Sequence, residues 1–253
     1  MKKKSLIVIR AGDYSLHAPW VSQKRESRSF DVAISYYGKH PEYWKNFCDY
    51  FEDGTGQSKF EGLSHFIRKN NSLIKQYDFI WFPDDDLSIS YQDIEVFFSL
   101  CREHQWTLSQ PSLMRGSYFS WSITLQKRIY QYRITNFVEV MAPCFNVSQF
   151  EEFIPSFSAS SSGWGLEALW LDIAQKSEVK CTFAIVDQVA MYHTRPVGSM
   201  GSGGAKNKPE DEMLKLLKQR NLPKIKPRIL GRHVNKFSPF IQYFLMKHSN
   251  RFF

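Results

Sequence analysis

Three consecutive aspartates follow a short, strongly apolar run in this 253-residue chain, within the segment IWFPDDDLSI at residues 80–89. The apolar run at residues 78–82 predicts a buried strand, so Asp84, Asp85 and Asp86 lie where that strand ends. Adjacent carboxylates repel one another and are costly to hold beside a sheet unless a cation is present. Oxygen ligands favour Mg²⁺ or Mn²⁺, which bridge carboxylates to substrate phosphates. The segment therefore predicts a divalent-cation site, and the alternative is a solvated acidic turn that caps the next helix.

The pattern of the whole chain indicates an α/β fold, because short apolar runs alternate with longer segments of helical periodicity. Such a fold has a largely parallel sheet flanked by helices. The expected strands are residues 5–10, 31–37, 78–82, 106–109, 136–141, 180–186 and 189–192. The expected helices are residues 60–76, 91–104, 165–175 and 209–220. Ligands of these sheets bind beyond the carboxyl ends of the strands, which is where the aspartate run lies.

The composition fits one domain with a sizeable core, since 43% of the residues are hydrophobic and 16% are aromatic. The charge, however, is unevenly distributed. Residues 1–205 carry 21 Lys and Arg against 22 Asp and Glu, whereas residues 206–253 carry 12 against 3. We therefore expect a main domain at residues 1–205 and a basic, helical C-terminal tail at residues 206–253.

The tail also has an apolar, aromatic stripe between Phe237 and Met246. Basic and aromatic residues together are typical of a peripheral membrane contact, and the alternative is a helix packed on the domain with a solvated basic face. The four cysteines are scattered and no apolar stretch is long enough to span a bilayer, so we expect a cytoplasmic protein that can contact the cytosolic membrane face. Because the basic charge is confined to the tail and lines no groove, we expect no nucleic-acid partner.

A histidine and an arginine follow the last apolar runs, in AIVDQVAMYHTRPV at residues 184–197. They precede a glycine-rich segment at residues 198–204, which we expect to be a loop that closes over a ligand. A neutral imidazole at His193 would complete the shell of the cation, and Arg195 would neutralise a diphosphate. A purely structural role for His193 is the alternative.

Two glycines flank a tryptophan in SSGWGLEALW, residues 161–170. Gly163 and Gly165 permit a sharp bend that presents the Trp164 indole, and Glu167 follows in the first turn of the expected helix. A carboxylate beside an indole at a sugar site is placed to act as a general base with a raised pKa. The alternative is that Glu167 is only an acid at a helix start.

These motifs resemble those of the GT-A glycosyltransferases, which have a DxD-like run after a hydrophobic strand, a Gly-Trp-Gly-x-acid segment and a late histidine near a flexible loop. The resemblance covers roughly residues 5–197. It implies a Rossmann-like, mixed and mostly parallel sheet and an enzyme that uses Mn²⁺ or Mg²⁺ with a nucleotide-sugar. By this resemblance Asp86 and His193 bind the metal, Asp84 contacts the nucleotide ribose, and Asp85 lies in the same donor site.

The glycine-flanked segment is similar to the acceptor-and-base motif of inverting β-galactosyltransferases. This similarity implies that Glu167 is the catalytic base and that Trp164 and Gly165 contact the acceptor. That motif continues with Glu-Asp, whereas Ala168 follows Glu167 here.

The N-terminal stretch IRAGDYSLHAPW, residues 9–20, resembles a poorly characterised bacterial group of GT-A-like proteins. This resemblance implies that the loop after the first strand, including Arg10 and Asp13, lies near the nucleotide base.

The expected function is transfer of a sugar from a nucleotide-sugar to a hydroxyl of a glycan or lipid-linked glycan, with inversion, as in bacterial polysaccharide or lipopolysaccharide biosynthesis. UDP is expected because it is the commonest nucleotide of such donors. A metal-dependent nucleotidyltransferase is the second hypothesis, but residues 10–20 lack its glycine-rich, lysine-containing phosphate loop. A non-catalytic glycan-binding module is the third, although its acidic run would repel phosphates without a metal.

Overall fold

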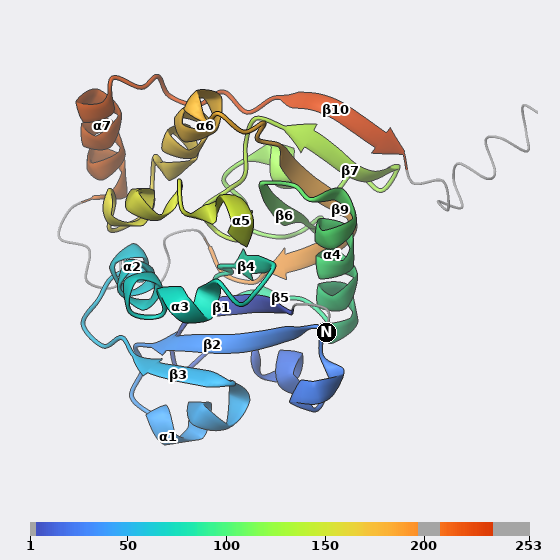
Figure 1. Cartoon of the computed structure of the whole chain (residues 1–253), viewed down its shortest axis with the longest axis vertical. Coiled ribbons are helices and arrows are strands. Elements are labelled where there is room, and N and C mark those ends of the chain that lie inside the picture. The colour runs from blue at the N-terminus through green and yellow to red at the C-terminus, as the bar shows by residue number, and fades with distance from the viewer. Residues whose placement is uncertain (1–3, 197–207, 235–253) are drawn as a thin grey trace, which may run out of the picture.

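The computed structural model describes residues 4–196 and 208–234. One mixed sheet passes through the molecule in the order β10-β7-β9-β6-β8-β4-β1-β2-β3, and β5 pairs with β9 beside it (Figure 1). The strands are β1 (Ser5–Ala11), β2 (Phe30–Tyr36), β3 (Tyr50–Asp53), β4 (Phe79–Trp81), β5 (Leu87–Ser88), β6 (Leu108–Leu113), β7 (Tyr130–Thr135), β8 (Cys144–Asn146), β9 (Phe183–His193) and β10 (Ile229–Val234). Within the main order, β7 and β8 run antiparallel to their neighbours and the other strands share one direction. The expected α/β class with a mostly parallel sheet is confirmed.

Helices cover both faces of this sheet, and two of them begin with side-chain caps. The α-helices are α1 (Pro41–Trp44), α2 (Lys59–Lys69), α3 (Asn71–Ile74), α4 (Tyr91–His104), α5 (Val147–Phe150), α6 (Leu166–Lys176) and α7 (Pro209–Arg220). A capping box of Ser58 and Glu61 begins α2, and the Ser90 hydroxyl accepts the Asp93 amide at the start of α4. The expected helices at residues 91–104 and 209–220 have these same bounds in the structure.

The core consists of two apolar layers, one on each face of the sheet. On one face, α4 and the segment after β1 pack their aromatic rings against strands, with Trp20 stacked on Trp81 at 5.7 Å between ring centroids. On the other face, α2 and α6 cover the sheet with Phe60, Phe66 and Trp170 among the buried residues. Figure 1 shows α4 on one side of the sheet and α2 and α3 on the opposite side. Burial on both faces explains why several strands are almost continuously apolar.

The sequence misplaced several strands of the second half. The strand expected at residues 136–141 is wrong, because this segment has apolar residues but crosses between β7 and β8 without a strand ladder. The two strands expected at residues 180–186 and 189–192 are one strand, β9, with a bulge opposite Pro111 and Ser112. Strands β3, β5, β7, β8 and β10 were not anticipated. Strands β3, β5 and β8 are short and β10 lacks a clear apolar alternation, whereas β7 does alternate Tyr130, Tyr132 and Ile134 with polar residues.

The C-terminal segment is built into the sheet domain as far as the structure describes it. Leu216 and Leu217 of α7 are buried, and the Glu212 carboxylate accepts the Ser162 amide at 2.9 Å. Strand β10 then pairs antiparallel with β7, so the boundary expected at residue 205 does not divide the sheet. The apolar stripe from Phe237 to Met246 and the glycine-rich segment 198–204 lie outside the described residues. In residues 4–196 and 208–234 no helix is both long and apolar enough to cross a membrane.

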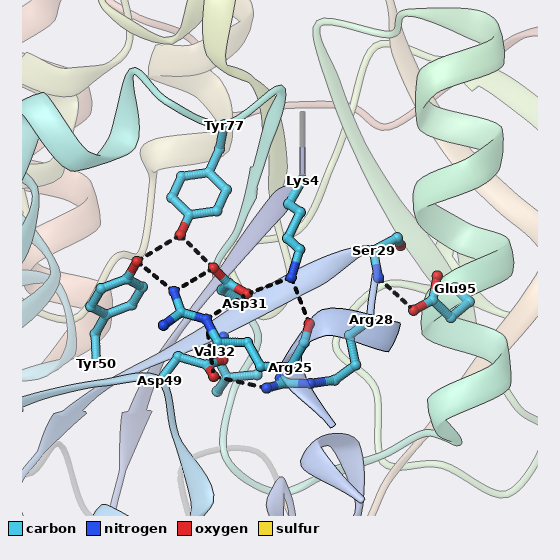
Figure 2. Close-up of polar contacts among 10 residues, drawn as sticks. All are labelled: Lys4, Arg25, Arg28, Ser29, Asp31, Val32, Asp49, Tyr50, Tyr77 and Glu95. Atoms are coloured by element: carbon cyan, nitrogen blue, oxygen red, sulfur yellow. Dashed lines mark hydrogen bonds and ion pairs between the residues drawn. The ribbon is translucent and has the colours of Figure 1, made fainter. Parts of the chain in front are cut away.

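A network of partly buried ion pairs lies at the amino end of β2 (Figure 2). The Asp31 carboxylate accepts hydrogen bonds from Lys4, from Arg25 at 2.8 Å and from the Tyr77 hydroxyl at 2.8 Å. Asp49 accepts from Arg28 and from the Val32 amide in the same network, drawn in Figure 2. These contacts hold the segment before β2 at the amino end of the strand, remote from the carboxyl ends where the candidate site lies.

Candidate functional site

The candidate site lies at the carboxyl ends of the central strands. The aspartate run follows β4, and His193 is the last residue of β9. Strand β5, which follows the aspartates, pairs antiparallel with the end of β9 so that Leu87 is opposite His193. The Thr194 amide also donates to the Asp86 carbonyl at 3.2 Å. Two segments far apart in the sequence are therefore fixed side by side by main-chain hydrogen bonds.

The three aspartates point to three different partners. Asp84 Oδ1 lies 2.5 Å from the Lys59 ammonium of α2. Asp85 Oδ2 accepts the Gly12 amide at 2.9 Å and the Tyr37 hydroxyl at 3.0 Å. Burial raises the pKa of Asp85 to about 6, against the opposing effect of the Gly12 amide. Asp85 thus holds the loop after β1, whereas Asp86 is left for a different partner.

Asp86 forms a pair with His193. Asp86 Oδ2 lies 3.3 Å from His193 Nε2, and His193 Nδ1 lies 2.8 Å from the Tyr118 carbonyl. A carbonyl can only accept, so Nδ1 carries the proton and Nε2 faces the carboxylate. Burial lowers the pKa of His193, but the Asp86 carboxylate outweighs burial and raises it above the ordinary value. Both side chains are buried, at 8% and 5% exposure for Asp86 and His193.

This pair fits a divalent cation on two observations. Asp86 Oδ1 is buried and has no hydrogen-bond partner in the described part of the chain, and the Tyr118 carbonyl fixes the imidazole orientation as outer contacts of metal ligands do. One carboxylate and one imidazole leave coordination positions for phosphate oxygens and water. Within residues 4–196 and 208–234, no three His, Cys, Asp or Glu side chains are grouped to hold a metal ion. A cation here would therefore need ligands from a substrate or from water.

Glu167 lies in the first turn of α6, where two glycines bend the chain. Both Gly163 and Gly165 have positive φ angles, of 85° and 92°, which favour glycine. A Cβ atom on Gly163 would lie 2.2 Å from the Phe60 ring, so this turn is held tightly against α2. Gly165 is buried against Met213 of α7, and the Trp164 side chain before it is half-buried.

The Glu167 carboxyl is buried, with 7% of the residue exposed. Burial raises its pKa to about 7, although backbone amides of Glu167, Val140 and Gly165 act in the opposite direction. A carboxyl with this pKa is poised to accept a proton near neutral pH.

Two further charged residues at the site were not anticipated from the sequence. Lys59, at the start of α2, bonds the Val140 carbonyl at 2.7 Å as well as Asp84. Glu139, in the segment that crosses from β7 to β8, is only 4% exposed. Burial and the nearby Glu167 charge raise its pKa to about 8. Neither residue belongs to a recognisable motif, so only the tertiary contacts reveal them.

The other predicted residues occupy the rim of the same edge. Arg10 is buried and donates to the Gly54 carbonyl at 3.1 Å and the Gln57 carbonyl at 2.6 Å, so it holds the loop after β3. Asp13 accepts the amides of Lys39 and His40 and the Tyr36 hydroxyl, so it holds the loop after β2. These contacts engage the charged groups of both Arg10 and Asp13 within the protein.

Arg195 lies closer to the aspartates. Its Nη2 donates to the Tyr14 carbonyl at 2.6 Å, and its Nη1 lies 3.7 Å from Asp85 Oδ1. The Nη1 atom is buried without a hydrogen-bond partner among the described residues. Arg195 is therefore a cation at the site whose hydrogen bonds are not all used.

A separate hollow of about 430 Å³ lies beside the amino end of β4. Its walls include Asp78, Asn146 and the exposed Lys75–Glu151 ion pair, and none of the predicted site residues. It is distinct from the edge that carries the aspartates.

The fold has solved relatives among proteins that bind nucleotides and sugars. It is similar to GalNAc-T7, crystallised with UDP, GalNAc and Mn²⁺, at a TM-score of 0.56 and 12% identity over 86% of this chain and 48% of that one. It is also similar to Staphylococcus aureus TarS 1–349 in complex with UDP-GlcNAc, at a TM-score of 0.50 and 8% identity over 85% of this chain and 65% of that one. The chain thus spans less than two thirds of either relative.

At such identities these similarities establish the fold alone, a GT-A-like sheet flanked by helices. No curated protein matches the sequence. A family model described as "Protein of unknown function (DUF707)" matches residues 3–229, which is most of the chain. The protein therefore belongs to the DUF707 family, with a GT-A-like fold and an Asp86–His193 pair at the carboxyl ends of its strands.

Proposed function

We propose that this protein is a metal-dependent glycosyltransferase that moves a sugar from a UDP-sugar to a hydroxyl of a glycan or lipid-linked glycan. The Asp86–His193 pair carries the proposal. It joins an oriented imidazole to a carboxylate whose buried Oδ1 has no partner among the described residues, at the ligand-binding edge of the sheet. The similar structures support the donor and the metal, since GalNAc-T7 was crystallised with UDP and Mn²⁺ and TarS with UDP-GlcNAc.

Asp86 and His193 would hold the cation, as Mn²⁺ or Mg²⁺. When bound, the ion supplies positive charge to the diphosphate oxygens of the donor. Arg195 adds a fixed positive charge beside Asp85, and its Nη1, which has no hydrogen-bond partner in the part of the chain that the structure describes, would donate to the same diphosphate. Asp84 and Asp85 would then act on the nucleotide side, with Asp85 holding the loop after β1 in place.

Glu167 is the proposed general base. Its carboxylate takes the proton of the acceptor hydroxyl while that oxygen forms a bond to the anomeric carbon, and the bond from this carbon to the diphosphate oxygen breaks with its electron pair. The nucleoside diphosphate leaves from the opposite face, so the anomeric configuration inverts. The burial that raises the pKa of Glu167 also excludes water that would otherwise compete as acceptor. Trp164 and Gly165 precede this base and are the proposed acceptor contacts.

The acceptor is proposed to be a sugar hydroxyl on a glycan or lipid-linked glycan at the cytosolic membrane face, with the basic C-terminal tail as the membrane contact. The described part of that segment supports this with exposed basic residues on the path into the tail. These are Lys224, Lys226, Arg228 and Arg232.

A thermal-shift panel with UDP, GDP, CDP and ADP, each with and without Mn²⁺, tests the proposed class. We expect stabilisation by UDP only when Mn²⁺ is present, and loss of this effect in Asp86→Ala. Asp172→Ala is a matched control, because this partly exposed aspartate of α6 forms an i,i+4 ion pair with Lys176.

Release of UDP from UDP-sugars provides the second readout. Slow hydrolysis of one UDP-sugar by the wild type in the presence of Mn²⁺, and no hydrolysis in its absence, supports the proposal. Binding of no nucleotide, or equal turnover in Asp86→Ala and in the wild type, contradicts it. Release of pyrophosphate from a nucleoside triphosphate would instead indicate a nucleotidyltransferase.

A further inference from the structure

Glu139 is a buried acid that the proposed chemistry does not use. Its main chain is fixed, because its amide donates to the Gln110 side chain at 2.6 Å and its carbonyl accepts the Ala142 amide at 3.3 Å. Gln110 itself is fully buried on β6. In contrast, Glu139 Oε2 is buried and has no hydrogen-bond partner among the described residues. The backbone is therefore rigidly held while one carboxyl oxygen is left without a partner.

The surroundings of Glu139 connect it with both halves of the candidate site. Its carboxyl interacts electrostatically with Glu167, the proposed base, and with His193 and Asp84 on the cation side. The two residues that follow Glu139 contact the cation side of the site. The Val140 carbonyl accepts the Lys59 ammonium, and the Met141 carbonyl accepts the Asp84 amide at 2.9 Å.

A buried polar oxygen without a partner destabilises a protein, so its presence calls for a ligand that supplies the missing hydrogen bond. A second carboxyl close to Glu167 adds to that destabilisation. The nearby Lys59 ammonium does not satisfy Glu139, because its contacts are with Asp84 and the Val140 carbonyl. A neutral hydroxyl is the group that fits, since it can donate to or accept from a carboxyl without adding charge.

The proposed displacement requires the transferred sugar to lie between the base and the diphosphate. In the proposed reaction the anomeric carbon lies between the Glu167 base and the diphosphate at Asp86 and His193, so the sugar ring occupies the space between them. We propose, on the basis of the proposed function, that Glu139 binds a hydroxyl group of the transferred sugar and thereby helps select the donor. It acts on the sugar and makes no contact with the nucleotide.

The test compares binding of UDP with binding of UDP-sugars by isothermal titration calorimetry in Mn²⁺. The probes are UDP, UDP-glucose, UDP-galactose, UDP-GlcNAc and UDP-GalNAc, and the variants are Glu139→Ala and Glu139→Gln. Loss of a hydrogen bond to a charged or buried group predicts a weakening of about tenfold for the best UDP-sugar in Glu139→Ala, with UDP affinity unchanged. Glu139→Gln keeps one hydrogen-bonding oxygen and is expected to lose less. Glu103→Ala, on the exposed side of α4, is the control.

These measurements distinguish a failure of the proposed function from a failure of the role of Glu139. If the wild type binds no UDP or UDP-sugar, the proposed function fails and the role of Glu139 fails with it. If the wild type binds a UDP-sugar but Glu139→Ala weakens UDP and the UDP-sugar by the same factor, or changes neither, only the role of Glu139 is overturned. If Glu139→Ala does not fold, Glu139→Gln decides, because a selective change in the KM for one UDP-sugar supports the role and an unchanged sugar preference contradicts it.

Discussion

His193 Nε2 lies 3.3 Å from Asp86 Oδ2, and a strand pairing holds the two residues together: Leu87, the neighbour of Asp86, is opposite His193 in the β5–β9 ladder. The Tyr118 carbonyl fixes the other imidazole nitrogen. A ligand pair held in this way is preorganised by the main chain, so a cation would bind without first ordering its protein ligands.

Replacement of His193 tests this arrangement directly. Because His193→Ala removes one of two protein ligands, we expect the apparent affinity for Mn²⁺ in the presence of UDP to fall by about tenfold or more. A Mn²⁺ titration at fixed UDP, followed by thermal shift, measures the effect. His65→Ala removes a half-exposed histidine on α2 and should leave the titration unchanged. Equal Mn²⁺ affinities in all three proteins would exclude His193 as a ligand.

Substitutions at two glycines with similar φ angles distinguish the cost of backbone strain from the cost of overpacking. Gly163→Ala places a Cβ 2.2 Å from the Phe60 ring at a φ of 85°, so it combines backbone strain with overpacking and should reduce the free energy of unfolding by about 2–4 kcal/mol. Gly116→Ala has a φ of 92° but meets only Tyr192 at 3.8 Å, and should reduce it by about 1 kcal/mol. Urea denaturation measures both, and a difference of opposite sign would contradict the tight packing of the Gly163 turn.

The raised pKa of Glu167 predicts the pH dependence of activity. Burial raises this pKa to about 7, and only the ionised carboxylate can accept the acceptor proton. Thus kcat/KM for hydrolysis of the best UDP-sugar should rise with pH up to about 7 and then level off, at saturating Mn²⁺. Glu167→Gln should lower kcat by about 100-fold or more and remove this rise. A profile of the variant that matches the wild type would exclude Glu167 as the base.

Glu139 should destabilise the cation-free protein as the pH rises. Its pKa is raised from 4.5 to about 8, so between these values the folded state keeps a proton that the unfolded state has lost. Stability therefore falls with increasing pH across this range. Glu139→Gln removes the effect and should increase the free energy of unfolding at pH 8 by up to about 4 kcal/mol, measured by urea denaturation in EDTA. A loss of stability in Glu139→Gln would instead indicate a structural role.

The network at the amino end of β2 should affect stability and leave ligand binding intact. Burial opposes ionisation of Asp31, but hydrogen bonds from Arg25 and Tyr77 outweigh it and lower its pKa. Its contribution is therefore present above the ordinary value of 3.8 and is lost as pH falls through the lower folded value. Asp31→Asn should reduce the free energy of unfolding at pH 7 by about 1–3 kcal/mol. The difference from the wild type should shrink below pH 3.8, and UDP binding should not change.

Hydrophobic periodicity predicted the main strands and helices of the first half of the chain. Strands β1, β2 and β4 are buried on both faces and are largely apolar, and α4 places Ile94, Phe97, Phe98 and Cys101 on one buried face. The strand predicted at residues 136–141 was wrong although the same signal was used. Phe137 and Val138 are buried and apolar, but burial alone does not distinguish a strand from an irregular crossing segment.

The amino-acid sequence by itself determined the class of fold and the residues with the chemistry of a cation site, because alternating apolar segments and a run of carboxylates after a strand are local patterns. The family resemblance already paired Asp86 with His193, but only the tertiary structure decided where the other two carboxylates point. The three aspartates are adjacent in sequence, yet their side chains diverge to Lys59, to the loop at Gly12 and to His193, each brought near by a different element. Glu139 is a second example of what the sequence does not show. Its buried position depends on its main-chain bond to Gln110 of β6 and on the nearby Glu167 of α6, which no local pattern encodes.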